Sequence, residues 1–366
     1  MQITFPTAYS EILVKIANID PVAYGKSRNH IHGTVTRLSP YISRGVISTR
    51  QVLQSVLQRG YKIPQIEQFV KELCWRDYFQ RVAQHKNVSE EIRHPQQPVS
   101  NRQIPAAIVN ATTGIQGIDS AIAELYQTGY MHNHCRMYTA SLVCNLAQSH
   151  WLQPAQWMYY HLLDGDWASN ACSWQWVAGA NSNKKYFANQ ENINRYTDTA
   201  QSGTFLDTSY ENLEKMSIPA ALSQTEPFQG QSTLPAQAAI SIDAALPTYI
   251  YNYYNLDPLW HQCESGNRIL LLDPDLFARF PVSEKCIAFM LALGQNIHGL
   301  QIFVGSFHDL LSQYGLTDVY FKEHPLNTGH QGTEEPRDWI LPEITGFYPS
   351  FFAYWKKAEK QLYQYF

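Results

Sequence analysis

The stretch 164-DGDWASNACSWQW-176 combines carboxylates, an amide and indole rings, but it contains no glutamate, no lysine and only one cysteine. Asp164, Asp166 and Asn170 recur at spacings of two and four residues. Taken alone, the two carboxylates predict the cap of a helix that begins near Ala168, because Asp accepts from the first backbone N–H groups of a helix. The rest of the chain offers neither a metal-ligand cluster nor a glycine-rich phosphate loop that could supply chemistry to this stretch.

Two other patches upstream carry charged or hydroxyl side chains. The first, 130-YMHNHCRMYTAS-141, brings Arg136, a permanent cation that can bind a carboxylate such as Asp164 through two hydrogen bonds. The second, 33-GTVTRLSPYISRGVIS-48, crowds hydroxyl residues around Arg37. Its composition suits a loop whose N–H groups bind phosphate, and it equally suits a capped helix start.

The composition is that of an ordinary globular protein, with 45% hydrophobic and 16% charged residues. Six dispersed cysteines without a CxxC pair predict reduced thiols, not disulfides or a metal site. The chain lacks a signal-peptide pattern and an 18-residue apolar run, so we expect a cytoplasmic protein without a membrane span. Residues 1–200 carry 18 Lys/Arg against 13 Asp/Glu, whereas residues 201–366 carry 9 against 18, so an anionic partner would prefer the first half.

Helical periodicity dominates the first half of the chain, and it is clearest in the segments 64–85, 118–128 and 131–149. After residue 247 the strand-like runs TYIYNYYN, RILLLDP, LQIFVG and DVYFKEH appear, with helical stretches near 284–297 and 307–314 between the last three. This order predicts parallel strands linked by helices. We therefore expect a mainly α N-terminal domain (1–200), a connecting segment (201–246) with one short helix, and a small Rossmann-like α/β domain with a parallel sheet and a C-terminal helix that docks by its aromatic face (247–366).

Four sequence signatures resemble the flavin-binding helical domain of the photolyase/cryptochrome family. They are TRLSPY, ELCWRDYF, GYMHNHCRM and DGDWASNACSWQWVAG, and they follow one another in this order along the first half of the chain. The last two form a highly specific combination. The resemblance implies that residues 1–200 bind FAD, and it relates the unusual composition of 164–176 to the electronic environment of a flavin.

The resemblance assigns cofactor roles to residues of all three patches. It implies that the FAD diphosphate and ribityl chain are held by Tyr24, Thr36, Arg37, Leu38 and Ser39. It implies further that Arg136 and Asp164 form a salt bridge beside the isoalloxazine, that Asp166 faces the flavin N3/O4 edge, and that Asn170 lies opposite N5.

A second set of residues resembles the substrate site of the family members that repair cyclobutane pyrimidine dimers. The set consists of Glu72, Trp75, Arg76, Asn133, Met137 and Trp176. Glu72, Trp75 and Arg76 share one helix face, and Asn133 and Met137 share another. Asn133, between two histidines, favours the cyclobutane dimer over the (6-4) photoproduct, for whose enzymes a His pair is expected. The resemblance thus implies light-driven repair of UV-damaged DNA by electron transfer from reduced FAD, with the damaged bases flipped out of the helix.

The sequence departs from the family pattern in three ways. The α/β segment follows the helical domain instead of preceding it. For this reason the sequence predicts neither the presence nor the identity of an antenna chromophore. Trp174 and Trp151 match the first two members of the usual electron-transfer tryptophan triad, but no Trp lies between residues 76 and 129. Trp157, Tyr159 and Tyr160 are the candidate substitutes. The segment 86–117 is short and weakly basic, which predicts a preference for single-stranded or locally open DNA.

The alternative hypothesis is a cryptochrome-like blue-light photoreceptor that signals through its C-terminal part. The acidic second half favours a protein partner for that portion, whereas the complete substrate set favours the repair enzyme. We expect no metal in either case.

Overall fold

The computed structural model describes residues 4–365 and contains two compact units. Unit 1 combines three stretches of the chain, Met1–Pro21, Thr36–His85 and Gln231–Phe366, and unit 2 combines Val22–Val35 with Lys86–Gly230. The domain boundaries expected at residues 200 and 246 stay a prediction. Over residues 4–365, no helix combines the length and apolar character that crossing a membrane requires.

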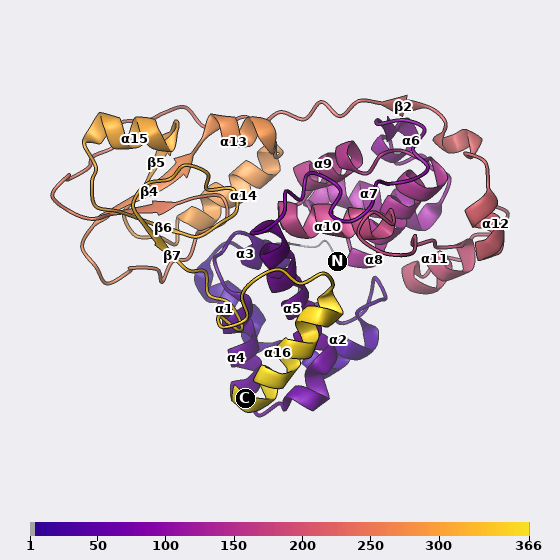
Figure 1. Cartoon of the computed structure of the whole chain (residues 1–366), viewed down its shortest axis with the longest axis horizontal. Coiled ribbons are helices and arrows are strands. Elements are labelled where there is room, and N and C mark those ends of the chain that lie inside the picture. The colour runs from indigo at the N-terminus through magenta and orange to yellow at the C-terminus, as the bar shows by residue number, and fades with distance from the viewer. Residues whose placement is uncertain (1–3, 366) are drawn as a thin grey trace. The chain divides into compact units, whose positions relative to one another are not determined.

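Unit 1 contains a parallel sheet with the strand order β5-β4-β3-β6-β7 (Figure 1). Its strands are β3 (Thr248–Tyr251), β4 (Asn267–Leu272), β5 (Leu300–Val304), β6 (Val319–Lys322) and β7 (Thr333–Glu335), and its helices are α13 (Pro274–Arg279), α14 (Glu284–Gly294) and α15 (Phe307–Tyr314). Because the chain runs outward from β4 to β5 and then returns to β6 beyond β3, right-handed crossovers place α14 and α15 on opposite faces. The predicted Rossmann-like layer is confirmed, although the sequence pattern predicts neither β7 nor α13.

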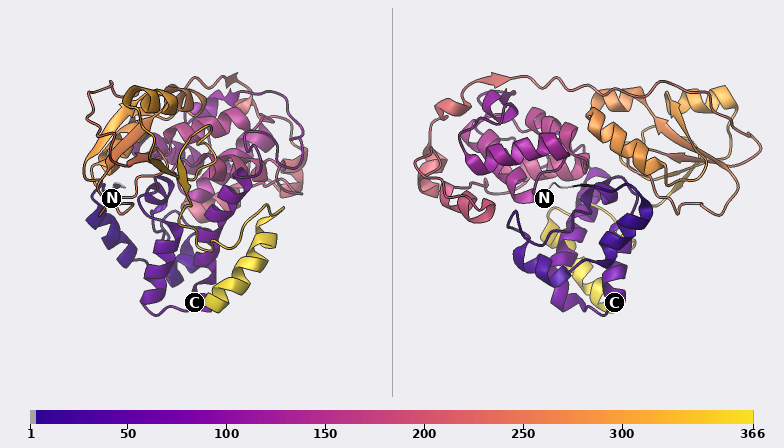
Figure 2. Two further views of the ribbon diagram at one scale, coloured as in Figure 1. Left: turned by 60° about the vertical axis from the view of Figure 1, so that its left-hand side comes forward. Right: turned by 180° about the vertical axis from the view of Figure 1, so that it is seen from behind.

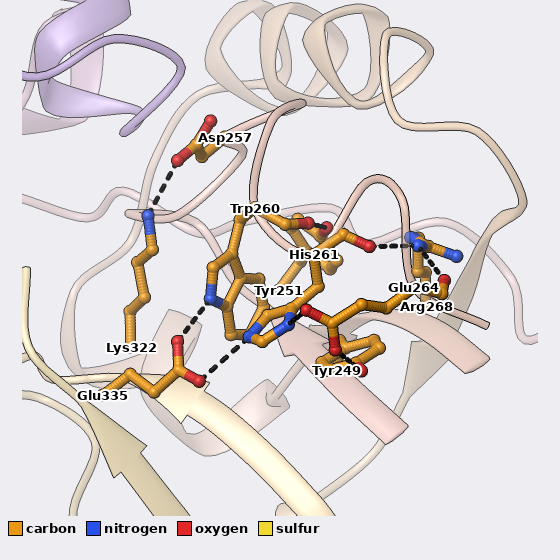
Figure 3. Close-up of polar contacts among 9 residues, drawn as sticks. All are labelled: Tyr249, Tyr251, Asp257, Trp260, His261, Glu264, Arg268, Lys322 and Glu335. Atoms are coloured by element: carbon orange, nitrogen blue, oxygen red, sulfur yellow. Dashed lines mark hydrogen bonds and ion pairs between the residues drawn. The ribbon is translucent and has the colours of Figure 1, made fainter. Parts of the chain in front are cut away.

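A polar network covers part of one face of this sheet (Figure 3). His261, from the loop between β3 and β4, stacks on the Tyr249 ring with centroids 4.2 Å apart. Its Nδ1 lies 2.7 Å from Glu264 and its Nε2 lies 2.9 Å from Glu335, a residue of β7. The Trp260 indole N–H also donates to Glu335, at 2.7 Å. The loop between β3 and β4 is therefore tied to the last strand of the sheet by side-chain hydrogen bonds.

The helical part of unit 1 consists of α1 (Tyr9–Ala17), α3 (Ser39–Ser43), α4 (Thr49–Gln58), α5 (Ile63–Ala83) and α16 (Phe351–Tyr365). The predicted helices at 64–85 and at the C-terminus are confirmed as α5 and α16. Figures 1 and 2 show α16 alongside α5. The buried face of α16 includes Phe351, Tyr354 and Trp355, so the aromatic docking predicted from sequence is also confirmed.

Unit 2 is a helical assembly with a short two-stranded sheet. Its elements are α2 (Pro21–Ser27, all but the first residue), β1 (Ile104–Pro105), α6 (Ala106–Val109), α7 (Gln116–Thr128), α8 (Asn133–Ser141), η1 (Leu142–Leu146), α9 (Leu152–His161), α10 (Trp167–Val177), α11 (Gln190–Thr197), α12 (Tyr210–Lys215), η2 (Ala220–Leu222) and β2 (Thr225–Glu226). The helix predicted for 118–128 is confirmed as α7, and the short helix of the connecting segment as α12.

The predicted helix 131–149 is wrong at its C-terminal end. The α-helical hydrogen bonding of α8 gives way to the π-helical turn η1 after Ser141. Gln148 has a φ of 52°, in the left-handed region, which does not continue a right-handed helix. The Asn145 amide also donates to Val177 and Tyr186 carbonyl oxygens, at 3.0 and 2.7 Å. These bonds hold the wider turn in place, and apolar periodicity alone does not reveal them.

Asp77, within the ELCWRDYF signature, anchors a distant segment to α5. Its side chain accepts from the Thr49 hydroxyl at 2.8 Å and from the Ile340 N–H at 2.9 Å. Burial raises the pKa of Asp77 to about 6, although both hydrogen bonds and the nearby Arg337 and Arg81 charges favour the ionised form. The carboxyl group therefore ties the chain between β7 and α16 to the helix that carries Glu72 and Trp75.

The raised pKa of Asp77 makes stability depend on pH. Between pH 3.8 and about 6, the folded protein keeps a proton that the unfolded chain releases, so the free energy of unfolding falls as pH rises through this window. We expect Asp77→Asn to flatten this dependence by about 3 kcal/mol, since the shift from 3.8 to about 6 spans roughly two pKa units and each unit is worth about 1.4 kcal/mol. Urea unfolding at several pH values measures it. Asp275→Asn, at an exposed site, is the control, and an unchanged pH profile in Asp77→Asn would contradict the prediction.

Candidate functional site

A nearly buried ion pair joins α8 of unit 2 to the turn before α10. Arg136, on α8, places Nη2 3.0 Å from both carboxylate oxygens of Asp164, whose side chain is 2% exposed. The Arg136 Nε–H donates to the Met131 carbonyl oxygen at 2.8 Å. The predicted pairing of Arg136 with Asp164 is therefore confirmed as a contact. Its role beside a flavin stays a prediction.

Helix α10 begins where the sequence predicts. The Asp166 carboxylate accepts from the Ser169 N–H at 2.7 Å and so caps the helix. One turn later, the Asn170 Nδ2 donates to the Ala155 carbonyl oxygen of α9, at 2.8 Å. This bond leaves Oδ1 of the Asn170 amide as the acceptor for another group. The roles of Asp166 and Asn170 toward a flavin stay predictions.

The cysteine in the middle of α10 is unsuited to nucleophilic catalysis. Cys172 is fully buried, and burial raises the pKa of its thiol far above the usual range. A buried thiol of this kind is inert because the reactive form is the thiolate. Among the described residues, no group of three or more His, Cys, Asp or Glu is arranged to hold a metal ion.

The TRLSPY segment forms a strained turn in unit 1. Arg37 has a φ of 52°, which costs a non-glycine residue of the order of 1 kcal/mol. Leu38, which follows it, has right-handed backbone angles, and its N–H approaches the Thr36 hydroxyl at 3.4 Å. Helix α3 begins at Ser39 without a side-chain cap, whereas Ser48, the last residue of the patch 33–48, caps α4 by accepting from the Gln51 N–H at 2.9 Å, so the capped-helix interpretation is confirmed for α4. A left-handed residue followed by a right-handed one is a backbone conformation that can direct successive N–H groups at an anion.

The predicted substrate residues of unit 1 lie together on α5. Glu72, Trp75 and Arg76 are half-buried and occupy adjacent turns. The Arg76 guanidinium donates to the Ser43 hydroxyl at 2.9 Å, and Glu72 accepts from the Gln68 amide at 3.1 Å. A carboxylate, an indole and a guanidinium are thus held in fixed positions by their neighbours.

Trp75 is stacked on a residue from the far end of the chain. The ring centroids of Trp75 and Phe351 lie 3.8 Å apart, with an angle of 10° between their planes. Phe351 is the first residue of α16, and its side chain is 3% exposed. The stack uses one face of the Trp75 indole and restricts its rotation. Sequence reasoning missed this contact, although the aromatic face of α16 is visible in the sequence.

The remaining predicted residues lie in unit 2. Asn133 and Met137 are neighbours on α8, with the Asn133 amide nitrogen 3.9 Å from the Met137 sulfur. Trp176 is 39% exposed and lies near the Tyr186 ring, and Tyr24 lies on α2. Trp174 and Trp151, the predicted electron-transfer residues, are 2% and 0% exposed. Their roles stay predictions.

The candidate substitutes for a third tryptophan differ in their surroundings. Trp157 is buried, and its indole N–H donates to the Tyr126 hydroxyl at 3.1 Å. Tyr160 packs edge-on against Phe228 with ring centroids 5.6 Å apart, whereas Tyr159 packs against Trp167. Each has aromatic neighbours, and the choice among them stays open.

Residues 69–255 match the family model described as the FAD binding domain of DNA photolyase. This match spans half of the chain. The chain belongs to the photolyase/cryptochrome family. It contains the family's FAD-binding domain, and FAD is therefore the cofactor that its residues must accommodate.

The curated relatives include both photolyases and a cryptochrome. The deoxyribodipyrimidine photo-lyase of Alkalihalophilus pseudofirmus is 28% identical over 190 residues, covering 49% of this chain and 38% of the relative. Cryptochrome DASH of Ostreococcus tauri is 32% identical over 214 residues, covering 54% and 37%. The chain thus spans less than two-fifths of the length of these relatives. Among solved structures, a Synechocystis cryptochrome aligns with 23% identity and a TM-score of 0.46, covering 54% of this chain and 44% of the other.

Two of the buried polar atoms without a hydrogen-bond partner among the described residues, one in each unit, are suited to contact a bound polar group. In unit 2 the Ser169 hydroxyl is buried without a hydrogen-bond partner among residues 4–365, one position before Asn170. In unit 1 the Arg37 Nε is buried and also lacks a hydrogen-bond partner among residues 4–365. Unsatisfied buried donors are rare in folded proteins and call for an explanation such as a ligand. The donors lie within the two stretches to which the family resemblance assigns FAD contacts.

Removal of the Asp164 carboxylate should reduce FAD retention. Asp164→Ala leaves the Arg136 charge without its buried partner, which costs roughly 3–5 kcal/mol, and it frees the guanidinium to rotate. We expect the ratio of flavin absorbance to protein to fall well below that of the wild type after gel filtration. Glu191→Ala, at an exposed site of unit 2, is the control, and far-ultraviolet circular dichroism verifies folding. Full FAD occupancy in a folded Asp164→Ala protein would show that the pair is dispensable.

Proposed function

We propose that this protein repairs cyclobutane pyrimidine dimers in DNA by light-driven electron transfer from reduced FAD. The observation that carries the proposal is the face of α5 on which Glu72, Trp75 and Arg76 stand half-buried together. A photoreceptor has no need for a carboxylate, an indole and a guanidinium on one helix face. The curated relatives named deoxyribodipyrimidine photo-lyase support the same function.

The contacts around α5 suit this substrate. The Phe351 ring stacks on one face of Trp75 and the Phe79 ring lies tilted beside it with centroids 5.2 Å apart, so a flipped base would stack on the part of the half-buried indole that these rings leave exposed. Stacking of this kind contributes roughly 1–3 kcal/mol per base. The Arg76 guanidinium, held by the Ser43 hydroxyl, is placed to donate to a pyrimidine carbonyl or to a phosphate. Glu72 would stabilise the dimer radical anion, as the family resemblance implies.

The residues of unit 2 suit an electron donor. When bound, reduced FAD supplies one electron after absorbing light, and it recovers the electron once the two cyclobutane bonds have opened. The Ala155 carbonyl holds Asn170 with Oδ1 as the acceptor, which favours a protonated flavin N5. The Arg136–Asp164 pair keeps a positive charge at a fixed place that can balance negative charge on the flavin. No general acid is required.

The test of this function is a repair assay with the full chain loaded with FAD. Reduced protein is mixed with a thymine-dimer oligonucleotide, single-stranded or duplex, and exposed to blue light or kept dark. We expect the ultraviolet absorbance of the intact bases to return only under light, and faster with the single strand, because its bases need no unpairing. A flavin spectrum without any return of base absorbance would refute the repair function. Equal rates on both substrates would refute only the strand preference.

Within the same assay, Glu72→Ala should lower the repair yield several-fold while FAD content stays unchanged. The reason is that a hydrogen bond to a charged group is worth roughly 1.5–3 kcal/mol. Glu67→Ala, one turn earlier on α5, removes a carboxylate that pairs with Lys71 and is the matched control. An equal yield for wild type and Glu72→Ala would remove Glu72 from the reaction.

A cryptochrome-like photoreceptor is the second candidate function. Its support is the similarity to cryptochrome DASH and the excess of acidic residues after residue 200, which suits a protein partner better than DNA. The two candidates predict different behaviour in the repair assay. A photoreceptor would change its flavin spectrum under light and leave the dimer intact.

A further inference from the structure

The solvent-exposed face of α16 carries both lysines and aromatic rings. Phe352 is 71% exposed and Tyr363 is 48% exposed, unusually high values for such large side chains. Lys356 and Lys360 are exposed at spacings that place them between these two rings on the same side of the helix. From Phe352 to Tyr363 the helix rises roughly 16 Å. This face, defined by the four residues, is called the α16 strip.

Positive charge is concentrated on α16 relative to the rest of residues 201–366. Residues 201–366 contain nine Lys/Arg and 18 Asp/Glu, yet three of the nine are Lys356, Lys357 and Lys360. Glu359 is the one acidic residue of α16, and it is half-buried at the edge of the strip. A local concentration of positive charge within an acidic half of the chain attracts a polyanion to one place.

Alternation of exposed rings with ammonium groups is the chemistry of single-stranded nucleic-acid binding. Lysines contact successive phosphates, and aromatic side chains stack on bases that a single strand leaves accessible. A duplex offers the phosphates but hides the base faces, so it would gain nothing from Phe352. An acidic peptide would use the lysines and would gain less from two separate rings.

The opposite face of α16 packs on the helix that carries Trp75. Phe351 stacks on Trp75, and one turn later Trp355 packs near Lys71 of α5, with the ammonium 5.1 Å from the ring centroid. These contacts hold α16 in place and leave the α16 strip on the side that faces away from α5.

We propose that the α16 strip binds single-stranded DNA. This inference rests on the proposed function for its choice of DNA as the polyanion. The strip would bind the strand whether or not it contains damage, because neither phosphate contacts nor ring stacking depend on a dimer.

The test measures binding of an undamaged, fluorescently labelled oligothymidylate to the full FAD-loaded chain in the dark, by fluorescence anisotropy. The double variant Lys356→Glu/Lys360→Glu should raise Kd at least tenfold at low salt. It should also reduce the dependence of log K on log salt by about 1.4, since each phosphate contact on a single strand contributes about 0.7. Phe352→Ser should raise Kd several-fold and leave the salt dependence unchanged, because it removes stacking alone.

The matched control is Lys215→Glu/Lys285→Glu, which makes the same charge change at two exposed lysines elsewhere. Circular dichroism confirms that α16 remains helical in each variant. Wild-type affinity in the α16 double variant would overturn the proposal, and so would an equal loss in the control or failure of the wild type to bind the oligonucleotide.

This experiment is independent of the repair assay. If the protein binds the single strand through α16 and does not repair dimers, this inference stands and the proposed function is refuted. If the Lys356→Glu/Lys360→Glu variant repairs dimers normally and binds single strands as well as the wild type does, the inference is refuted and the proposed function stands.

Discussion

The Arg136–Asp164 ion pair is the interaction around which unit 2 is arranged. A carboxylate that is 2% exposed is costly unless a cation accompanies it, so α8 and the turn before α10 must meet. The Arg136 guanidinium also binds the Met131 carbonyl, which fixes the start of α8. Asp166, two residues after Asp164, then caps α10 and sets the direction in which Asn170 and Trp174 project. One ion pair thereby determines the placement of several residues that the family resemblance assigns to the flavin.

Local patterns predicted a large part of this structure. The Asp cap of α10, the span of α5, the positions of four parallel strands and the docking face of α16 all follow from residue types at short spacings. The pairing of Arg136 with Asp164 was suggested by the residue types and implied by the family resemblance. These features depend on interactions whose chemistry is visible in a short segment.

Contacts between distant segments were beyond prediction. The stack of Phe351 on Trp75 joins residues at opposite ends of the chain, and no local pattern identifies which ring of α16 meets which ring of α5. The left-handed backbone at Arg37 is equally hidden, because arginine has no preference for that conformation. The bond of His261 to Glu335 depends on the sheet order β3-β6-β7, which the sequence pattern does not supply. The family resemblance identified candidate site residues that hydrophobic periodicity could not identify.

The division of unit 1 among three stretches of sequence has a consequence for synthesis. Unit 2 ends at Gly230, so a growing chain contains all of it while the sheet and α16 have yet to emerge from the ribosome. Helix α5 precedes unit 2 in the sequence, whereas its partner α16 follows unit 2. Until residues 340 to 351 have been synthesised, Trp75 lacks Phe351 and Asp77 lacks the Ile340 N–H, so this face of α5 is completed only after the whole of unit 2 has been made.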